Sequence, residues 1–354
     1  MLLYIFIAVW PLIVGWIYYN RPLAVGDNCL SLNKHIFIAL LPIFILLAFR
    51  SGEMGADTGT YVRHFERMIN TSIEQEFNIT RMEHGYILFV KAITYLTHNG
   101  LVYQIVCVSI IMLGLFVFLM DQEENAFYTL FFYITLGLFM FSFTGVRQCI
   151  AMSLCLLSYH FVKDKKYIRF VIFIALAFCF HKSAILFVAV PFIMNLKIGF
   201  VKTVLYGGTA LIAGRYLDRI QAWFNEQLQY DYEIEATGNG GIFLGVLLLL
   251  TIYSLVEIFN YYNSLNKNKV EIQLMNINFI AIFFWLMRLS TRIAERPSFY
   301  FLFFSCALFG HVLNKDEETK SNKIFKILII CFSITLYIYR LRTNFASLVP
   351  YQFY

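Results

Sequence analysis

Four short polar segments of this largely apolar chain carry side chains that could bind an anion or transfer a proton. They lie at residues 50–61, 145–148, 181–183 and 288–300. Three of them contain arginine, whose planar fork of donors suits carboxylates and phosphates. The other contains a histidine, the side chain best suited to proton transfer near neutral pH. Together the four segments indicate chemistry on an anionic substrate, most simply a phosphate-bearing one.

The first segment, RSGEMGADTGTY, places Arg50 and Asp57 around glycines that allow a tight backbone. Arg50 could clamp a phosphate, while Asp57 could orient a hydroxyl or act as a base. Tyr61 follows one helical turn after Asp57. The alternative interpretation is a helix end followed by a helix that Asp57 caps.

The next two segments lie at the ends of predicted helices. Arg147 and Gln148 open a span, where a helix N-terminus favours anions, and the pair could bind an oxyanion or a pyrophosphate. The alternative is that Arg147 extends to the phosphate of a lipid headgroup. His181 and Lys182 stand between two short apolar stretches. His181 is a candidate general base, unless it only satisfies a helix end.

The last segment holds three arginines in nine residues against a single carboxylate, Glu295. An ion pair with Glu295 would use one arginine, and the remaining positive charge indicates an anionic ligand. Arg292 and Arg296 are therefore candidate substrate ligands. Arg340 and Arg342, nearer the C-terminus, are expected to anchor to lipid headgroups.

The composition places these segments in a membrane protein. Of 354 residues, 60% are hydrophobic and only 14% charged, whereas a soluble domain has about 25% charged residues. The mean hydropathy is +0.67. The net charge of +6 favours anionic lipid headgroups and gives no indication of nucleic-acid binding. We expect an all-α, polytopic integral membrane protein in which residues 1–354 form one transmembrane domain.

About twelve apolar runs are candidates to span a bilayer. They lie near residues 1–19, 35–49, 101–120, 126–144, 147–162, 168–180, 184–195, 200–215, 241–261, 274–291, 298–313 and 324–340. Short connectors carry the lysines, which the positive-inside rule places in the cytoplasm. In this topology both termini lie outside. Twelve of the fourteen arginines then face outward and twelve of the fourteen lysines inward.

Two longer stretches, 50–100 and 216–240, face outward in this topology. Within the first, residues 58–69 could form a short helix, and residues 84–97 have an apolar face at helical spacing. This second helix is too short to span comfortably, so we expect it to lie at the interface or to re-enter. If it crosses, the orientation of everything before it is reversed.

In their order along the chain, these four segments and a fifth motif at residues 83–86 resemble the EpsG family of Wzy-like bacterial polysaccharide polymerases. The resemblance is carried by Arg50…Gly55-Ala56-Asp57-Thr58…Tyr61, Glu83-His84-Gly85-Tyr86, Val146-Arg147-Gln148…Ala151, Phe180-His181-Lys182-Ser183-Ala184 and Glu295-Arg296…Tyr300-Phe301. It runs over residues 50 to 301, most of the chain. Met54 and Ala56 depart from the plainer small-residue turn expected between Arg50 and Asp57.

The resemblance implies a membrane glycosyltransferase that makes O-antigen, capsule or exopolysaccharide. Its substrate would be an oligosaccharide repeat on undecaprenyl diphosphate, delivered by a flippase to the periplasmic face of the bacterial inner membrane. The hydroxyl of an incoming repeat attacks the anomeric carbon of the growing chain, and undecaprenyl diphosphate leaves. A co-polymerase that regulates chain length is a common companion in such pathways.

This reaction suggests a role for each candidate. Arg147, Arg296 and Arg50 would bind the diphosphate, because preorganised cations stabilise developing negative charge in a low-dielectric site. His181 or Asp57 would accept the hydroxyl proton. The remaining substrate-binding candidates are Tyr61, Glu83, Gln148, Lys182, Arg292 and Tyr300. With several cations available, we predict no metal and no cofactor.

Two other classes of protein stay open. A flippase for the same lipid-linked sugar would place charges on both sides of the membrane midplane, whereas the arginines here concentrate at one face. A ligase, or another outward-facing transferase such as an acyltransferase, would use much the same arginine and histidine chemistry. The sequence therefore separates a ligase poorly from a polymerase.

Overall fold

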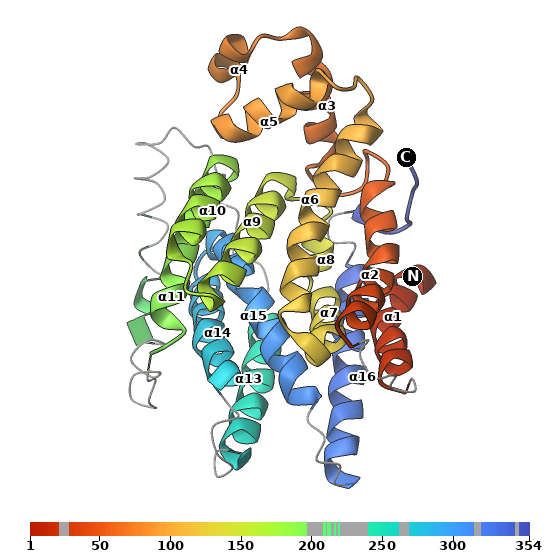
Figure 1. Ribbon diagram of the computed structural model, residues 1–354, viewed down its shortest axis with the longest axis vertical. Coiled ribbons are helices and arrows are strands. Elements are labelled where there is room, and N and C mark those ends of the chain that lie inside the picture. Colours follow the sequence, from red (N-terminus) through yellow and green to blue (C-terminus); the bar gives the residue numbers. More distant parts are fainter. Residues whose placement is uncertain are drawn as a thin grey trace. The chain divides into compact units, whose positions relative to one another are not determined.

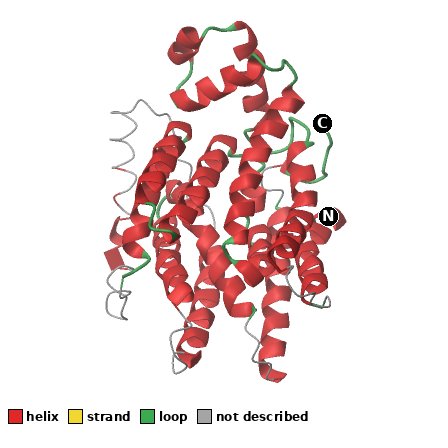
Figure 2. Cartoon of the chain, in the orientation of Figure 1, coloured by secondary structure: helices red, strands yellow, loops and turns green. Residues whose placement is uncertain are grey.

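The computed structural model is all-helical in the residues that it describes, and no strand occurs among them (Figure 2). The described residues are 1–20, 28–196, 208–209, 211–213, 216, 219, 240–261, 269–314, 320–343 and 347–354. The predicted all-α class is confirmed. Most of the expected outward stretch 216–240 and most of the expected span 200–215 lie outside the described residues.

The chain divides into two compact units, which are described separately. The first unit comprises Met1–Ile185 and Leu313–Tyr354, and the second comprises Leu186–Val312. The first unit holds α1 (Leu2–Tyr19), α2 (Asn28–Ala48), α3 (Thr58–Asn70), α4 (Ile73–Ile79), α5 (His84–Thr94), α6 (Gly100–Met120), η1 (Glu123–Asn125), α7 (Ala126–Thr135), α8 (Leu138–Phe141), α9 (Val146–Lys163), α10 (Tyr167–Phe180) and α16 (Lys320–Arg342). The single transmembrane domain stays a prediction, because two compact units can belong to one domain.

The second unit is also helical. It holds α11 (Val190–Ile193), α13 (Gly241–Tyr261), α14 (Lys269–Arg288), η3 (Arg292–Ala294) and α15 (Glu295–Leu313), and the 3-10 helix η2 (Lys182–Ala189) runs into it from the first unit. The expected span 184–195 is thus a 3-10 helix followed by one short α-helical turn.

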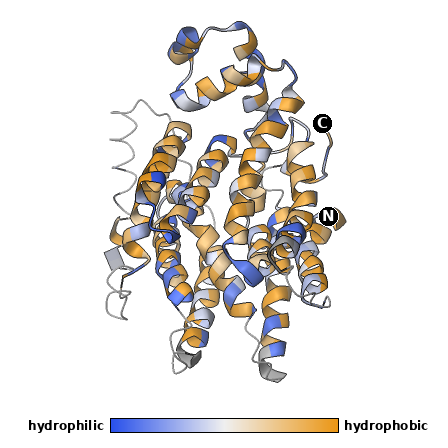
Figure 3. Cartoon of the chain, viewed as in Figure 1, coloured by the Kyte–Doolittle hydropathy of each residue, from blue (hydrophilic) through white to orange (hydrophobic). Residues whose placement is uncertain are grey.

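Six helices in the described part of the chain are long and apolar enough to cross a membrane. They are α1, α2 from Ser31, α6, α13 up to Ile258, α14 and α16 from Lys323. Apolar residues run along these helices in Figure 3. The protein is therefore a multi-pass membrane protein, while the count of about twelve spans stays a prediction.

The expected span 126–144 is broken in two. α7 ends at Thr135, and Gly137 adopts a φ of +96°, in the left-handed region that glycine favours. The Arg340 Nη1 donates a hydrogen bond to the carbonyl oxygen of Leu136 at 3.0 Å. A Cβ at position 137 would lie only 2.4 Å from the same Nη1. Arg340 thus stabilises this break, while the headgroup anchoring expected of Arg340 and Arg342 stays a prediction.

Helices α3, α4 and α5 lie together beyond one end of α6 (Figure 1, orange). They confirm the helices expected over 58–69 and 84–97. The Lys91 Nζ on α5 donates to the carbonyl oxygens of Met68 at 2.8 Å and Thr71 at 2.9 Å. These carbonyls belong to the C-terminal end of α3, where backbone acceptors lack helical partners. Lys91 therefore joins α5 to the end of α3.

Two close helix contacts bring the polar segments of the first unit to one end of the α9–α10 pair. α9 and α10 pack side by side and are joined by a short connection, so the start of α9 and the end of α10 lie at the same end. A Cβ at Gly85 would lie 2.5 Å from the Cβ of Cys179, so α5 approaches α10 as closely as glycine allows. This contact places the start of α5 beside the end of α10.

Candidate functional site

An ion pair between Glu83 and Arg147 forms the centre of the site. Glu83 is the N-cap residue of α5, and Arg147 lies in the first turn of α9. The Nη1 of Arg147 donates to the Glu83 Oε2, and the Glu83 Oε1 accepts a longer bond of 3.4 Å from the backbone N–H of Lys182. One carboxylate thus contacts the Arg147 cation and the turn that follows His181. The Arg147 and Glu83 side chains are only 18% and 5% exposed, which strengthens their attraction.

Two tyrosine rings flank the Arg147 guanidinium. Its central carbon lies 5.9 Å from the ring centres of both Tyr61 and Tyr86, within the range of cation–π attraction. Its Nε also donates weakly to the Tyr61 hydroxyl at 3.5 Å. The second terminal nitrogen, Nη2, makes no hydrogen bond to any described residue. The guanidinium is therefore held on one side and retains donor capacity for an anion.

His181 ends α10 in an extended conformation and is buried. Its Nδ1 lies 2.6 Å from the Ser183 Oγ. Where Nδ1 carries the proton and donates it to Ser183, the lone pair on Nε2 can accept a proton, as a general base requires. The adjacent Ala184 N–H donates to the His181 carbonyl oxygen at 3.0 Å and fixes this turn.

Arg50 is placed differently from Arg147. It is 1% exposed, and its Nη1 donates to the carbonyl oxygen of Leu47 while its Nε donates weakly to the Thr58 hydroxyl at 3.4 Å. Burial lowers the pKa of Arg50 to about 10. Its guanidinium lies over the Phe143 ring at 5.6 Å. In this conformation Arg50 closes the end of α2 and cannot reach a ligand at the surface.

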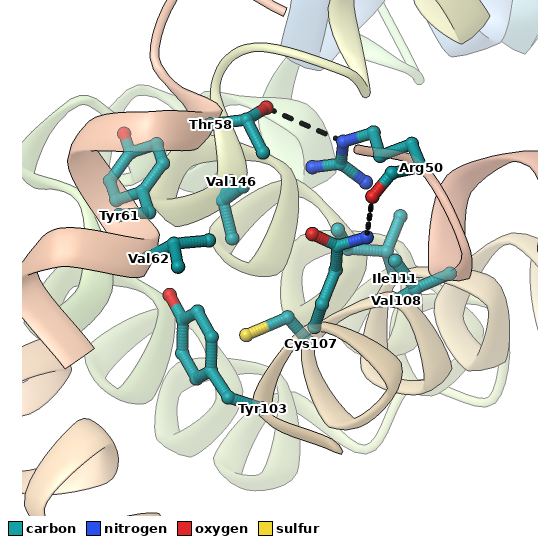
Figure 4. Close-up of a pocket in the computed structure, with 10 residues that line it drawn as sticks. Arg50, Thr58, Tyr61, Val62, Tyr103, Cys107, Val108, Ile111 and Val146 are labelled. Carbon is teal, nitrogen blue, oxygen red and sulfur yellow. Dashed lines mark hydrogen bonds between the residues drawn. The ribbon is translucent and has the colours of Figure 1, made fainter. Parts of the chain in front are cut away.

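A small cavity lies beside Arg50 and is also lined by the first turns of α6 (Figure 4). Its lining includes Thr58, Tyr61, Tyr103, Gln104 and Cys107. The Gln104 amide nitrogen donates to the carbonyl oxygens of Ala48 and Arg50, each at 2.9 Å, whereas its Oε1 has no hydrogen-bond partner among the described residues. Gln104 therefore completes the end of α2 from a neighbouring helix.

Asp57 is the N-cap residue of α3, as the sequence suggested, but its carboxylate makes no capping hydrogen bond. It is half-buried, and no described residue forms an ion pair with it. Its backbone carbonyl accepts from the Tyr61 N–H at 3.1 Å, so one turn of α3 links Asp57 to the tyrosine beside Arg147. The carboxylate therefore stays available to a ligand.

The other predicted residues of the first unit lie close to this centre. Gln148 is buried next to Arg147 on α9, and Lys182 is half-buried next to His181. The structure therefore brings together Tyr61, Glu83, Arg147, His181 and Lys182, with Gln148 adjacent in sequence.

The arginine-rich segment belongs to the second unit. The Nε of Arg288 lies 2.9 Å from the Glu295 Oε2, which confirms the expected ion pair of Glu295. Arg292 begins η3, Arg296 lies in the first turn of α15, and both are exposed. Tyr300 is buried farther along α15. Arg292 and Arg296 therefore stay candidate ligands, while the ring of Tyr300 is buried.

No group of three or more potential metal-binding side chains occurs within the described ranges. The acidic residues of the stretch 216–240 lie outside those ranges. The absence of a metal from the predicted site therefore stays a prediction.

The comparison with protein families identifies the chain. The EpsG family model matches residues 33–353, nearly the whole sequence. The chain belongs to the EpsG family. This confirms the resemblance drawn from the five motifs, and it makes the chain a member of a Wzy-like polysaccharide polymerase family. Comparison with curated proteins and with solved structures finds no match.

Three residues of this EpsG-family site were not among the predicted ligands. Tyr86 flanks Arg147 and also hydrogen-bonds the Tyr103 hydroxyl at 2.5 Å. Ser183 orients His181, and Gln104 closes the end of α2. Tyr86 and Ser183 stand inside motifs that the sequence displays. Gln104 is marked only by being a polar residue in an apolar helix.

Proposed function

We propose that this EpsG-family protein is a glycosyltransferase of the bacterial inner membrane that polymerises oligosaccharide repeats at its periplasmic face. The repeats would be carried on undecaprenyl diphosphate and would form O-antigen, capsule or exopolysaccharide. The observation that carries this proposal is the grouping of Arg147 with His181 through Glu83. It brings a cation and a candidate base to one end of adjacent helices.

The reaction exchanges one bond of the anomeric carbon for another. The oxygen of an acceptor sugar hydroxyl bonds to the anomeric carbon of the growing chain, and the bond from that carbon to the diphosphate oxygen breaks. The hydroxyl proton passes to the Nε2 of His181, and undecaprenyl diphosphate leaves with the electron pair. General-base catalysis of this kind typically accelerates a reaction by about 10²–10⁴-fold, which corresponds to a barrier lower by about 3–5 kcal/mol.

Arg147 is the proposed ligand of the leaving diphosphate. A guanidinium held by Glu83 and two tyrosine rings is oriented before substrate arrives, so it stabilises developing charge without reorganising. Asp57 and Tyr61 are suited to orient sugar hydroxyls. Arg292 and Arg296 stay proposed diphosphate ligands on the evidence of the sequence, whereas the burial of Arg50 favours a supporting role.

The test is a polymerisation assay with purified protein in nanodiscs and its lipid-linked repeat, with products separated as a ladder. Arg147→Ala and His181→Ala are expected to abolish the ladder, which should resist EDTA in the wild type. Matched controls are Arg63→Ala and His98→Ala, because Arg63 and His98 are exposed and lie outside the site. A wild type that binds the repeat but never lengthens it would overturn the proposal in favour of a flippase or a ligase.

A further inference from the structure

Residues 347–354 lie along the loop that follows α2, although the two segments are far apart in the sequence. Phe353 and Arg50 form an isolated antiparallel bridge. The N–H of Ser51 donates to the Gln352 carbonyl oxygen at 2.9 Å, and the N–H of Tyr354 donates to the Phe49 carbonyl oxygen at 2.8 Å. These backbone bonds join the segment to the loop at the start of the first predicted site motif.

The same segment satisfies acceptors at the end of α2. The last four carbonyls of a helix have no partner within the helix, and leaving one buried and unpaired costs about 1–3 kcal/mol. The Tyr351 hydroxyl donates to the Leu46 carbonyl oxygen at 2.9 Å. Gln104 and Arg50 serve the next carbonyls. Residues 347–354 thus complete a helix end that the rest of the protein satisfies only in part.

The segment is anchored at both of its ends. Leu348 is fully buried, and its carbonyl oxygen accepts a hydrogen bond of 2.5 Å from the Tyr4 hydroxyl on α1. The N–H of Gln352 points at the sulfur of Met54, 3.0 Å away, and Met54 is buried in the motif loop. The family match extends to residue 353 and so includes nearly all of the segment.

From the loop, direct contacts lead to the start of α9. The Thr58 hydroxyl donates to the Phe143 carbonyl oxygen at 2.7 Å. Gly55, at a φ of +89°, packs so closely on Phe143 that an added Cβ would lie 2.0 Å from the same oxygen. Phe143 lies just before α9, whose first turn carries Arg147. The loop also leads directly into α3, which holds Tyr61 against Arg147.

We propose that residues 347–354 act as a strap that positions the motif loop 49–58, and through it Tyr61 and the start of α9, for polymerisation. Tyr351 is the main positioning residue of this strap, because its hydroxyl bonds a carbonyl of α2 directly. The proposal rests on the proposed function for its catalytic consequence, but the positioning of the loop can be measured without turnover.

The test compares three full-length variants with the wild type in nanodiscs. The first combines Tyr351→Gly, Gln352→Ser, Phe353→Gly and Tyr354→Ser. The second is Tyr351→Phe, which deletes only the hydroxyl bonded to Leu46. The third, Tyr354→Phe, is the matched control, because the Tyr354 hydroxyl makes no hydrogen bond to a described residue and its ring is exposed. Hydrogen exchange over residues 49–58, the thermal midpoint and the polymerisation rate are measured for each.

We expect faster exchange confined to residues 49–58 in the first variant, a smaller increase in Tyr351→Phe and none in Tyr354→Phe. A general loss of structure would instead raise exchange throughout and lower the thermal midpoint. The first variant should lose turnover by about tenfold or more, because small misplacements of positioned groups cost rate steeply. Unchanged exchange over 49–58 in the first variant would overturn the strap, even if the wild type made no polymer. Altered exchange with full turnover would overturn its positioning role alone.

Discussion

The carboxylate of Glu83 bonds to the Arg147 guanidinium through one oxygen and to the Lys182 N–H through the other, the latter at 3.4 Å. These two hydrogen bonds join α5 to α9 and to the turn after α10. It changes the role expected of Glu83, because a carboxylate engaged on both oxygens is better placed to position Arg147 and the His181 turn than to bind a sugar. Glu83 is therefore a positioning residue in the proposed reaction.

Glu83→Gln should destabilise the protein. Removing one partner of a buried ion pair leaves an uncompensated charge and typically costs about 3–5 kcal/mol. Because Arg147 is partly exposed, we expect the free energy of unfolding to fall by about 3 kcal/mol, the lower end of that range. Denaturant titration in detergent measures it. The double variant Glu83→Gln with Arg147→Gln should recover much of the loss. Equal stability of the single variant and the wild type would show that the pair contributes little.

Ser183→Ala should slow polymerisation by about tenfold, while Ser183→Thr keeps most of the rate. The Ser183 hydroxyl is bonded to Nδ1 of His181, and losing it frees the ring to adopt the other tautomer or to turn. The rate is measured against pH for both variants. If Ser183 orients His181, Ser183→Ala should alter the pH dependence of the polymerisation rate as well as its maximum value. An identical profile in Ser183→Ala would contradict this role.

Gly55→Ala should lower the stability of the folded protein far more than Gly52→Ala. Gly55 has a φ of +89° and no room for a Cβ, whereas a Cβ at Gly52 meets no atom within 4 Å. The strained conformation costs an alanine about 1–3 kcal/mol before any clash with Phe143 is counted. Thermal midpoints of the two variants make the comparison, and polymer yield shows whether the loop matters for activity. Similar midpoints would mean that the loop adapts easily.

Acidification should destabilise the packing of α3 against α4 and α5 through His64. Burial lowers the pKa of His64 to about 4, although the neighbouring Glu76 carboxylate, 3.0 Å from its Nε2, opposes the shift. The unfolded chain binds a proton on this histidine near pH 6.5. Between about pH 6.5 and 4 the unfolded state therefore holds more protons, so the free energy of unfolding falls as the pH falls.

His64→Phe isolates this contribution. Phenylalanine keeps the stacking on Tyr86, which lies 5.6 Å from His64 between ring centres, but it cannot bind a proton. The thermal midpoint of the variant should fall less than that of the wild type between pH 7 and pH 5. Parallel curves would assign the acid sensitivity to other groups. Arg67 remains to pair with Glu76 in the variant, so that carboxylate is not left alone.

The class of protein and many of its helices follow from local sequence alone. Apolar content and length predict α6 at 101–120 and α9 at 147–162, and the structure has them at Gly100–Met120 and Val146–Lys163. Helices form from hydrogen bonds between near neighbours, so a local window of sequence contains most of the information. The five motifs were also sufficient to indicate the EpsG family, because their residue types and order are read directly from the chain.

Which charged side chains meet depends instead on how distant segments pack together. Arg50 and Arg147 each lie in a short polar motif, and the sequence does not distinguish them. In the structure Arg50 is buried against the end of α2, whereas Arg147 is partly exposed between two tyrosines. The break at Gly137 follows from a backbone conformation stabilised by Arg340, and the partners of α2 include residues 351 and 354. Each outcome depends on contacts between distant segments, which side-chain packing selects and no local pattern encodes.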